Sequence, residues 1–316
     1  MIVYMEIVGH LAQQSFFSSC IESGKLSHAY IFTGPKSVGK RTVANWLVRE
    51  LVQESLNEDL VHSDIHIVTQ EINEKTGKTK KHIDVDQIRA LRSHMTKSSM
   101  RGGYRIGIID DAHKMNVQSA NALLKTLEEP GERSLIILIT SDEMMLPGTI
   151  RSRAHAVAFA PVAMEQIETA LVARGASAEH ARTLAIQSLG KVGQAISWYT
   201  SQGEIFDTTQ QALFCGLIGK PLYQKYEAVE KLFGKKIDHI ADRAQLTHVL
   251  ASWQIVLRDS ILVSSGHAAY AVHTNIPALP VSAALAAERA IADAITGLSQ
   301  NIHPRLLLDR ILFTLP

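Results

Sequence analysis

The sequence predicts an α/β core built on a parallel sheet, followed by a region made only of helices. Two apolar runs, residues 105–109 and 135–139, are too short for typical helices and have the pattern of buried parallel strands. A glycine-containing loop at residues 34–39 lies between an apolar strand pattern and a helical pattern, which is the setting of a phosphate-binding loop. After Pro161 the sequence becomes alanine-rich with helical periodicity and has no further strand pattern.

Length and composition indicate a soluble protein of several domains. A chain of 316 residues exceeds what one hydrophobic core usually organises. We expect a core at residues 1–160, a small helical lid at 161–205 and an all-α domain at 206–316. The net charge of +1 carries no overall nucleic-acid signature, so any DNA contact must come from a local patch.

Cysteine content and hydropathy bear on where the protein works. The chain has only Cys20 and Cys215, which excludes a disulfide framework and suits a reducing compartment. The first residues show no pattern of a secretion signal, and no apolar run approaches the roughly 18 residues of a membrane span. We therefore expect a cytoplasmic protein with no membrane association.

The loop at residues 34–41 has the features of a phosphate cradle, because backbone N–H groups and a helix N-terminus converge on one anion there. Active loops follow the lysine with Ser or Thr, whose hydroxyl ligates magnesium. Arg41 occupies that position, and the next residue, Thr42, points about 100° away around the helix. We expect poor magnesium placement, with any nucleotide held by the backbone and Lys40; a glycine turn without a ligand is the alternative. The candidate nucleotide-binding residues in the loop are Gly34, Pro35, Gly39, Lys40 and Arg41.

Polar side chains follow both buried strands. Asp110 and Asp111 come directly after the first strand, and Thr140 ends the second. Parallel strands deliver such groups to a ligand crevice at one sheet edge. These residues are therefore candidates for the same nucleotide site, and Asp110 could ligate magnesium through water. Two solvated acids at a strand end are the plainer alternative, and we expect His113 to be a turn residue and not a metal ligand.

A helix at about residues 85–95 carries a basic face. Phosphate contacts by such residues would be independent of DNA sequence and sensitive to salt. A solvated helix face is an equally good interpretation. The DNA-backbone candidates are Arg89, Arg92, Lys97 and Arg101.

Several motifs resemble the AAA+ ATPases and, within them, the clamp-loader proteins of bacterial DNA polymerase III, most closely the delta-prime type. The run NALLKTLEEP at residues 121–130 and the pair Ser152 and Arg153 carry most of the resemblance. Residues 28–30, 83–89 and 301–306 extend it over most of the chain, although the first two hundred residues carry nearly all its weight. The resemblance implies an AAA+ core with a parallel sheet, a helical lid and a helical collar through which subunits form a ring.

The resemblance also assigns a role to Arg153. In the family this arginine follows a serine, here Ser152, and reaches into the neighbouring subunit's nucleotide site. Such arginine fingers contribute on the order of a thousandfold or more in rate. Ala154 replaces the usual cysteine without touching the finger chemistry, and an ordinary surface arginine is the alternative.

Three positions depart from the pattern of active relatives. Arg41 replaces the magnesium-ligating hydroxyl, Asp111 replaces a glutamate, and Gly193 replaces the arginine of the lid's sensor turn. Aspartate is one methylene shorter than glutamate, which withdraws the carboxylate by about 1.5 Å, and errors near 1 Å can cost about a hundredfold in rate. We expect ATP hydrolysis by the isolated chain to be absent or very weak.

The resemblance further implies cofactors and partners. We expect ATP or ADP without efficient hydrolysis, and no zinc, because the cysteine cluster of many relatives is missing near residues 54–64. Expected partners are gamma/tau-type and delta-type subunits through the collar and AAA+ faces, the sliding clamp indirectly or weakly, and primer-template DNA. An ATP-hydrolysing motor, such as a gamma/tau-type subunit or a helicase loader, is the alternative. A small-molecule kinase would leave Arg153 and the helical final third unexplained.

Overall fold

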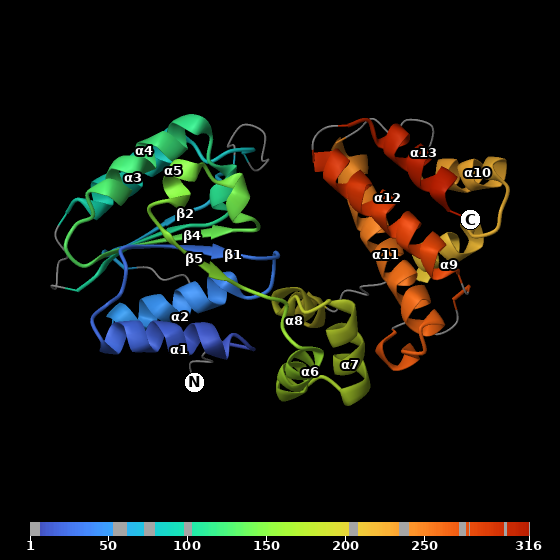
Figure 1. Ribbon diagram of the computed structural model, residues 1–316, viewed down its shortest axis with the longest axis horizontal. Helices are drawn as coiled ribbons and strands as arrows, with labels where there is room; N and C mark the ends of the chain where they lie inside the picture. The colour runs from blue at the N-terminus through green and yellow to red at the C-terminus, as the bar shows by residue number, and fades with distance from the viewer. Residues whose placement is uncertain are drawn as a thin grey trace. The chain divides into compact units, whose positions relative to one another are not determined.

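The computed structural model describes residues 7–52, 62–72, 80–97, 103–201, 208–233, 240–271, 276–277, 279–299 and 302–315. The chain forms two compact units, Met1–Ser197 and Trp198–Pro316 (Figure 1). Each unit is described by itself below.

The first unit is built on one five-stranded sheet in which every pair of neighbouring strands is parallel. All seven residues of its central strand are buried, as expected for a parallel sheet covered on both faces. The predicted fold class is confirmed. In sheet order the strands are β2 (Ile65–Val68), β3 (Arg105–Ile109), β4 (Ser134–Thr140), β1 (Ala29–Thr33) and β5 (His155–Ala158).

Helices cover both faces of this sheet (Figure 1). Successive residues of β4 point to opposite faces: Ile137 packs with Phe17 and Leu47 beneath the first two helices, whereas Ile136 packs with Leu91 beneath the other layer. The first layer holds α1 (Leu11–Glu22) and α2 (Lys40–Val52), and the second holds α3 (Val85–Met95), α4 (Val117–Glu128) and α5 (Gly148–Arg151).

Local signals explain where the second layer's helices begin and end. Gln87 Oε1 accepts a hydrogen bond from the backbone N–H of Asp84 just before α3, and Asn116 Oδ1 accepts one from Ser119 N at the start of α4. Both bonds satisfy backbone donors that a helix start leaves free. Pro130 follows α4 closely and cannot continue its hydrogen bonding.

Three short helices follow the sheet: α6 (Met164–Ala173), α7 (Ala178–Gln187) and α8 (Val192–Ser201). A backbone hydrogen bond ties this predicted lid to the core, from Gly193 N to Ser37 O (2.7 Å). The core and most of the lid therefore lie in one compact unit, and the boundary between them at residue 160 stays a prediction.

The second unit is helical throughout its described residues, as the sequence predicts. Its core contains Phe214 and Trp253, whose ring centroids are 5.0 Å apart. In the part of the chain that the structure describes, no helix is both long and apolar enough to cross a membrane. The helices are α9 (Thr208–Leu217), α10 (Leu222–Phe233), α11 (Ile240–Ser264), the 3-10 turn η3 (Ala268–Tyr270), α12 (Val281–Ser299) and α13 (Pro304–Thr314).

Candidate nucleotide site and arginine face

The predicted phosphate loop connects β1 to the first turn of α2, and its glycines are required by the backbone. Gly34 has φ 143° and Gly39 has φ 114°, values that side chains other than glycine rarely adopt. A Cβ on Gly34 would lie 2.2 Å from Phe159 O, the carbonyl just after β5. The loop can close against the sheet only because this position lacks a side chain.

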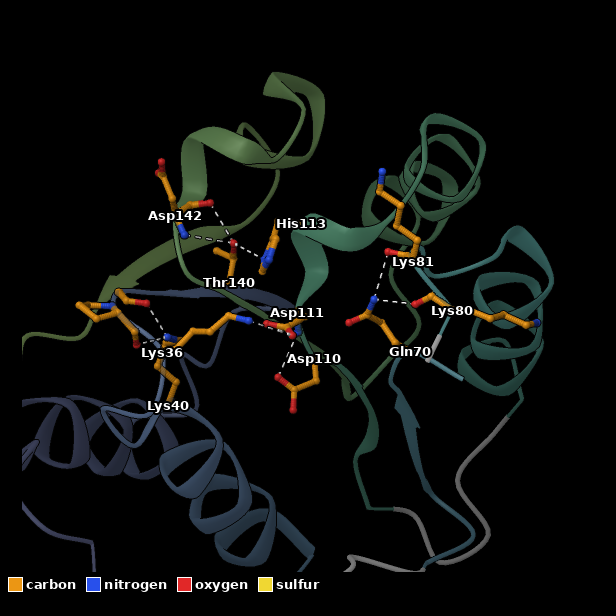
Figure 2. Close-up of polar contacts among 12 residues, drawn as sticks. Lys36, Lys40, Gln70, Lys80, Lys81, Asp110, Asp111, His113, Thr140 and Asp142 are labelled. Carbon is orange, nitrogen blue, oxygen red and sulfur yellow. Dashed lines mark hydrogen bonds and ion pairs between the residues drawn. The ribbon is translucent and has the colours of Figure 1, made fainter. Parts of the chain in front are cut away.

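Lys40 is folded under the loop. It is 6% exposed, and its Nζ donates hydrogen bonds to Gly34 O (2.5 Å) and Pro35 O (2.6 Å), as Figure 2 shows. Burial lowers the pKa of Lys40 below its ordinary value, while the carboxylates of Asp111 and Asp110 act in the opposite direction. The ammonium is thus held against the loop backbone by two carbonyl oxygens.

Arg41 joins the loop helix to the acids at the end of β3. Its Nη1 lies 3.1 Å from Asp110 Oδ2, and its Nε donates to Asn45 Oδ1 at 2.9 Å, one turn along α2. The other carboxylate oxygen of Asp110 accepts from Asp111 N at 3.1 Å. Magnesium takes oxygen ligands at about 2.0–2.1 Å in near-octahedral geometry. A guanidinium against the acid does not fit that ion.

Asp111 begins the 3-10 turn η1 (Ala112–Lys114) and has φ 47°, in the left-handed region. Its carboxylate lies 3.8 Å from Lys36 Nζ, and both side chains are partly exposed (Figure 2). The structure therefore brings both predicted acids to the loop, each beside a cation of the same chain.

Thr140, at the end of β4, is fully buried. Its Oγ1 donates to Asp142 O at 2.9 Å and lies 3.3 Å from His113 Nδ1, as Figure 2 shows. Asp142 precedes a second 3-10 turn, η2 (Glu143–Met145). Burial lowers the pKa of His113, so its imidazole favours the neutral form. The hydroxyl of Thr140 thus makes its contacts within the strand-end turn and with η1.

Gly193, the predicted departure in the lid, lies directly on the loop. Its N–H donates to Ser37 O, and a Cβ at this position would lie 3.1 Å from the same oxygen. That distance is tighter than most Cβ contacts. The lid packs closely on the loop here because this position has no side chain.

Arg153 lies at the surface, beyond α5. Its side chain is 36% exposed, and Nη2 makes an ion pair with Glu128 Oε1 at 2.8 Å. Nη1 donates to Thr149 O at 3.0 Å and to Ser152 Oγ at 3.2 Å. The guanidinium is therefore fixed by one acceptor at the end of α4 and two in and just after α5, while part of the side chain remains accessible to a neighbouring molecule.

The structure brings only some of the predicted DNA-backbone candidates together at one surface. Arg89 and Arg92 line an open hollow of about 510 Å³ between α3 and α4, whereas Lys97 is exposed but is not among the residues lining it. Arg89 also pairs with Asp86 at 2.9 Å. Arg101 lies outside the described residues. The hollow is lined by Arg89, Arg92, Ser93, Met95, Thr96, Lys125, Thr126, Glu129 and Gly131.

Lys125 is the residue of this hollow that the sequence analysis missed. It lies on α4, inside the run NALLKTLEEP, and is exposed. The only local signal for it is its place on the polar face of α4, and the packing of α4 on α3 brings it to the hollow. Among the described residues, no group of three or more His, Cys, Asp or Glu side chains is placed to hold a metal ion.

Comparison with known families gives one match in the first unit. Residues 9–163 match the family model described as DNA polymerase III, delta subunit. The matched segment contains the loop, both acids and Arg153.

Two kinds of curated relatives are similar to the same part of the chain. The delta-prime subunit of DNA polymerase III from Bacillus subtilis is 33% identical over 178 residues, which cover 52% of each chain. The gamma/tau subunit from Mycobacterium tuberculosis is 33% identical over 165 residues, 48% of this chain and 28% of the relative. The matches thus span about half of the delta-prime relative and less of the gamma/tau relative.

A solved structure supports the fold. A DNA polymerase III gamma-subunit-related protein from Thermotoga maritima has a TM-score of 0.51 and 17% sequence identity, covering 94% of this chain and 97% of that protein. At this identity the likeness shows fold alone. Residues 9–163 therefore match the DNA polymerase III delta-subunit family model and are similar in sequence to delta-prime and gamma/tau clamp-loader subunits.

Proposed function

We propose that this chain is a delta-prime-type clamp-loader subunit that activates a neighbouring ATPase through Arg153 and has little or no ATPase of its own. It would assemble with gamma/tau-type and delta-type subunits and help to load a sliding clamp on primer-template DNA during replication. One observation carries the proposal: Arg41 pairs with Asp110 inside the loop site, whereas Arg153 pairs with Glu128 outside that site, with part of its side chain accessible.

Weak hydrolysis in cis follows from the loop geometry. The acid that would hold magnesium, Asp110, is paired with Arg41, and the acid that would orient water, Asp111, lies near Lys36. Both roles need a carboxylate placed to within about 1 Å. The lid's sensor position, Gly193, offers no charge to a γ-phosphate.

Action in trans follows from the position of Arg153. A planar guanidinium is suited to phosphate oxygens because it presents donors in a fixed fork. Glu128 and Thr149 hold this fork in one orientation, which reduces the entropy lost when it meets a phosphate. A finger of this kind stabilises charge that develops on the transferred γ-phosphoryl group.

The hollow between α3 and α4 supports a contact with the DNA backbone. It brings Arg92 and Lys125 from different helices to one surface, and Glu129 at its rim opposes them. Cations alone would position a duplex without reading its sequence. We assign this surface to primer-template DNA within the assembled loader.

The test is reconstitution with gamma/tau-type and delta-type partners and a sliding clamp, followed by DNA-stimulated ATPase measurement. Arg153→Ala should lower turnover by more than roughly tenfold at one site, consistent with what fingers contribute, while the assembly still forms by gel filtration. The matched control is Arg182→Ala, which removes an exposed arginine from α7. Equal turnover for Arg153→Ala and the control would contradict the finger role.

Gamma/tau-type relatives are as similar in identity as the delta-prime relative, so an ATP-hydrolysing motor is the second candidate function. The two candidates predict different rates of ATP turnover for the isolated chain. Turnover by the purified chain comparable to that of an active motor subunit would favour the motor. Turnover at background would favour the delta-prime type.

A further inference from the structure

The charges of the loop site are balanced without a metal ion. An active site of this class has an anionic ligand, two acids, one lysine and magnesium, and the ion offsets the excess of negative charge. Here an additional fixed cation, Arg41, stands 3.1 Å from Asp110. It is anchored on its other side by Asn45, one turn along α2. The guanidinium is therefore part of the fold and not a loosely held surface group.

The geometry points to Arg41 as a built-in substitute for the divalent cation, so we infer that the loop takes the phosphates of a nucleotide without magnesium. Arginine suits this role because its charge is permanent and its donors match phosphate oxygens. The inference rests on the loop still accepting a phosphate and does not depend on Arg153.

The loop retains the parts that hold a phosphate independently of metal. Gly34 and Gly39 keep the backbone conformation of the cradle, and the loop runs into the N-terminus of a 13-residue helix. Lys40 lies beneath it with its ammonium fixed by two carbonyl oxygens. These groups contribute hydrogen-bond donors and positive charge without magnesium.

Magnesium, in contrast, would have to displace an existing partner. Both oxygens of Asp110 already accept a contact, Oδ2 from Arg41 and Oδ1 from Asp111 N. An incoming divalent ion at Oδ2 would also lie next to the guanidinium, and like charges this close repel. Position 41 is an arginine and offers no hydroxyl ligand.

The experiment measures binding of a fluorescent ADP, N-methylanthraniloyl-ADP, to the full chain in magnesium chloride and in EDTA. For the wild type we expect dissociation constants that agree within about twofold in the two buffers, because Asp110 is not free to ligate the ion. Arg41→Thr restores the hydroxyl and releases Asp110, so its binding should become at least about tenfold tighter with magnesium than in EDTA.

Two further variants keep the inference testable if Arg41→Thr folds poorly. Asp110→Asn releases Arg41 from its ion pair, and we expect binding in EDTA to be retained or tightened. Lys40→Ala should lose binding in both buffers, which would assign the probe to the loop. Thermal unfolding of each variant reports whether it is folded.

Three results would overturn the inference. Wild-type binding that tightens tenfold or more with magnesium would mean that the ion displaces Arg41. Absence of saturable binding in EDTA would mean that Arg41 does not support a phosphate. Unchanged binding by Lys40→Ala would place the probe outside the loop.

Discussion

Arg41 and Arg153 are alike in exposure but differ in what they contact. The side chains are 32% and 36% exposed, and each makes an ion pair with a carboxylate, at 3.1 Å and 2.8 Å. Arg41 pairs with Asp110, an acid that phosphate chemistry would use. Arg153 pairs with Glu128, which lies at the end of α4 and outside the loop site.

The partner, more than the exposure, thus decides what each arginine can do. Pairing with Asp110 joins the arginine to an acid of the loop site. Pairing with Glu128 fixes Arg153 and involves no residue of the phosphate loop. The comparison teaches that one sheet can hold strand-end acids that already lie beside cations of the loop and, beyond α5, a surface arginine whose partner lies outside that loop.

A third ion pair provides a structural reference for these two. Asp64 Oδ1, just before β2, lies 3.3 Å from Nη2 of Arg105 at the start of β3, and the two side chains are 4% and 8% exposed. Asp64→Ala would leave a buried guanidinium without its carboxylate, and such losses cost about 3–5 kcal/mol in the free energy of unfolding. Chemical denaturation of the full chain measures this loss in the free energy of unfolding.

The control for that prediction is Asp86→Ala, which breaks the exposed pair with Arg89. Exposed pairs contribute about 0–1 kcal/mol, so this variant should unfold nearly as the wild type does. If Asp64→Ala were as stable as Asp86→Ala, burial would not distinguish the ion pairs of this chain.

A change at Glu128 should have the next largest effect, on ATPase turnover, because Glu128 positions the guanidinium of Arg153. Glu128→Ala should lower DNA-stimulated turnover of the assembly by roughly three- to tenfold, since a misplacement near 1 Å is costly. Glu128→Gln keeps an oxygen acceptor and should lose less. In an Arg153→Ala background the same substitution should have no further effect.

This double-mutant cycle separates positioning from an independent role. Losses that multiply in the double variant would show that Glu128 acts apart from Arg153. A loss for Arg153→Ala with none for Glu128→Ala would retain the finger and reject its positioning by Glu128.

Primer-template binding by the assembly gives a smaller expected effect. Arg92→Ala and Lys125→Ala should each weaken binding equally for all DNA sequences and reduce the slope of log affinity against log salt by about one. Fluorescence anisotropy at several salt concentrations measures this. Lys81→Ala, an exposed lysine outside the hollow, is the control, and an equal slope change there would remove the assignment.

The smallest expected effect is the pH dependence of the first unit's stability. His66 and His94 stack with ring centroids 5.4 Å apart, and burial lowers the pKa of each; Arg105 also lowers that of His94, while Asp64 raises it. The unfolded chain then binds more protons than the folded chain below about pH 6.5. Stability should therefore fall as pH drops from that value toward the lowered pKa values.

Thermal unfolding between neutral and mildly acidic pH measures this loss. His94→Gln should flatten the dependence, because one of the imidazoles with a lowered pKa is removed. A midpoint that rises on acidification would contradict the direction assigned to both imidazoles.

Much of the fold could be predicted from local patterns. The helix expected at about residues 85–95 matches α3 in the structure, and the apolar runs at residues 105–109 and 135–139 lie in β3 and β4. These elements have strong periodicity or buried apolar runs, with caps and prolines at their ends. Gly77 amid charged residues predicts an exposed turn or hairpin at residues 71–81, of which residues 73–79 lie outside the described residues.

The site was predictable as a set of residues but not as a set of contacts. Parallel strands had to bring Asp110 and Thr140 to the loop's edge of the sheet. Nothing local indicates that Arg41 would pair with an acid 69 positions away, or that Glu128 would hold Arg153. Such pairings depend on side-chain directions after packing. The same reason explains why Lys125 escaped notice, since it joins Arg92 only across two packed helices.

The most direct test compares the two regions in one assay, the DNA-stimulated ATPase of the reconstituted assembly. Lys40→Ala disables the chain's own loop, and we expect turnover within about twofold of the wild type, whereas Arg153→Ala should lower it by more than about tenfold. The reverse pattern, with turnover lost on changing Lys40 and kept on changing Arg153, would contradict the account.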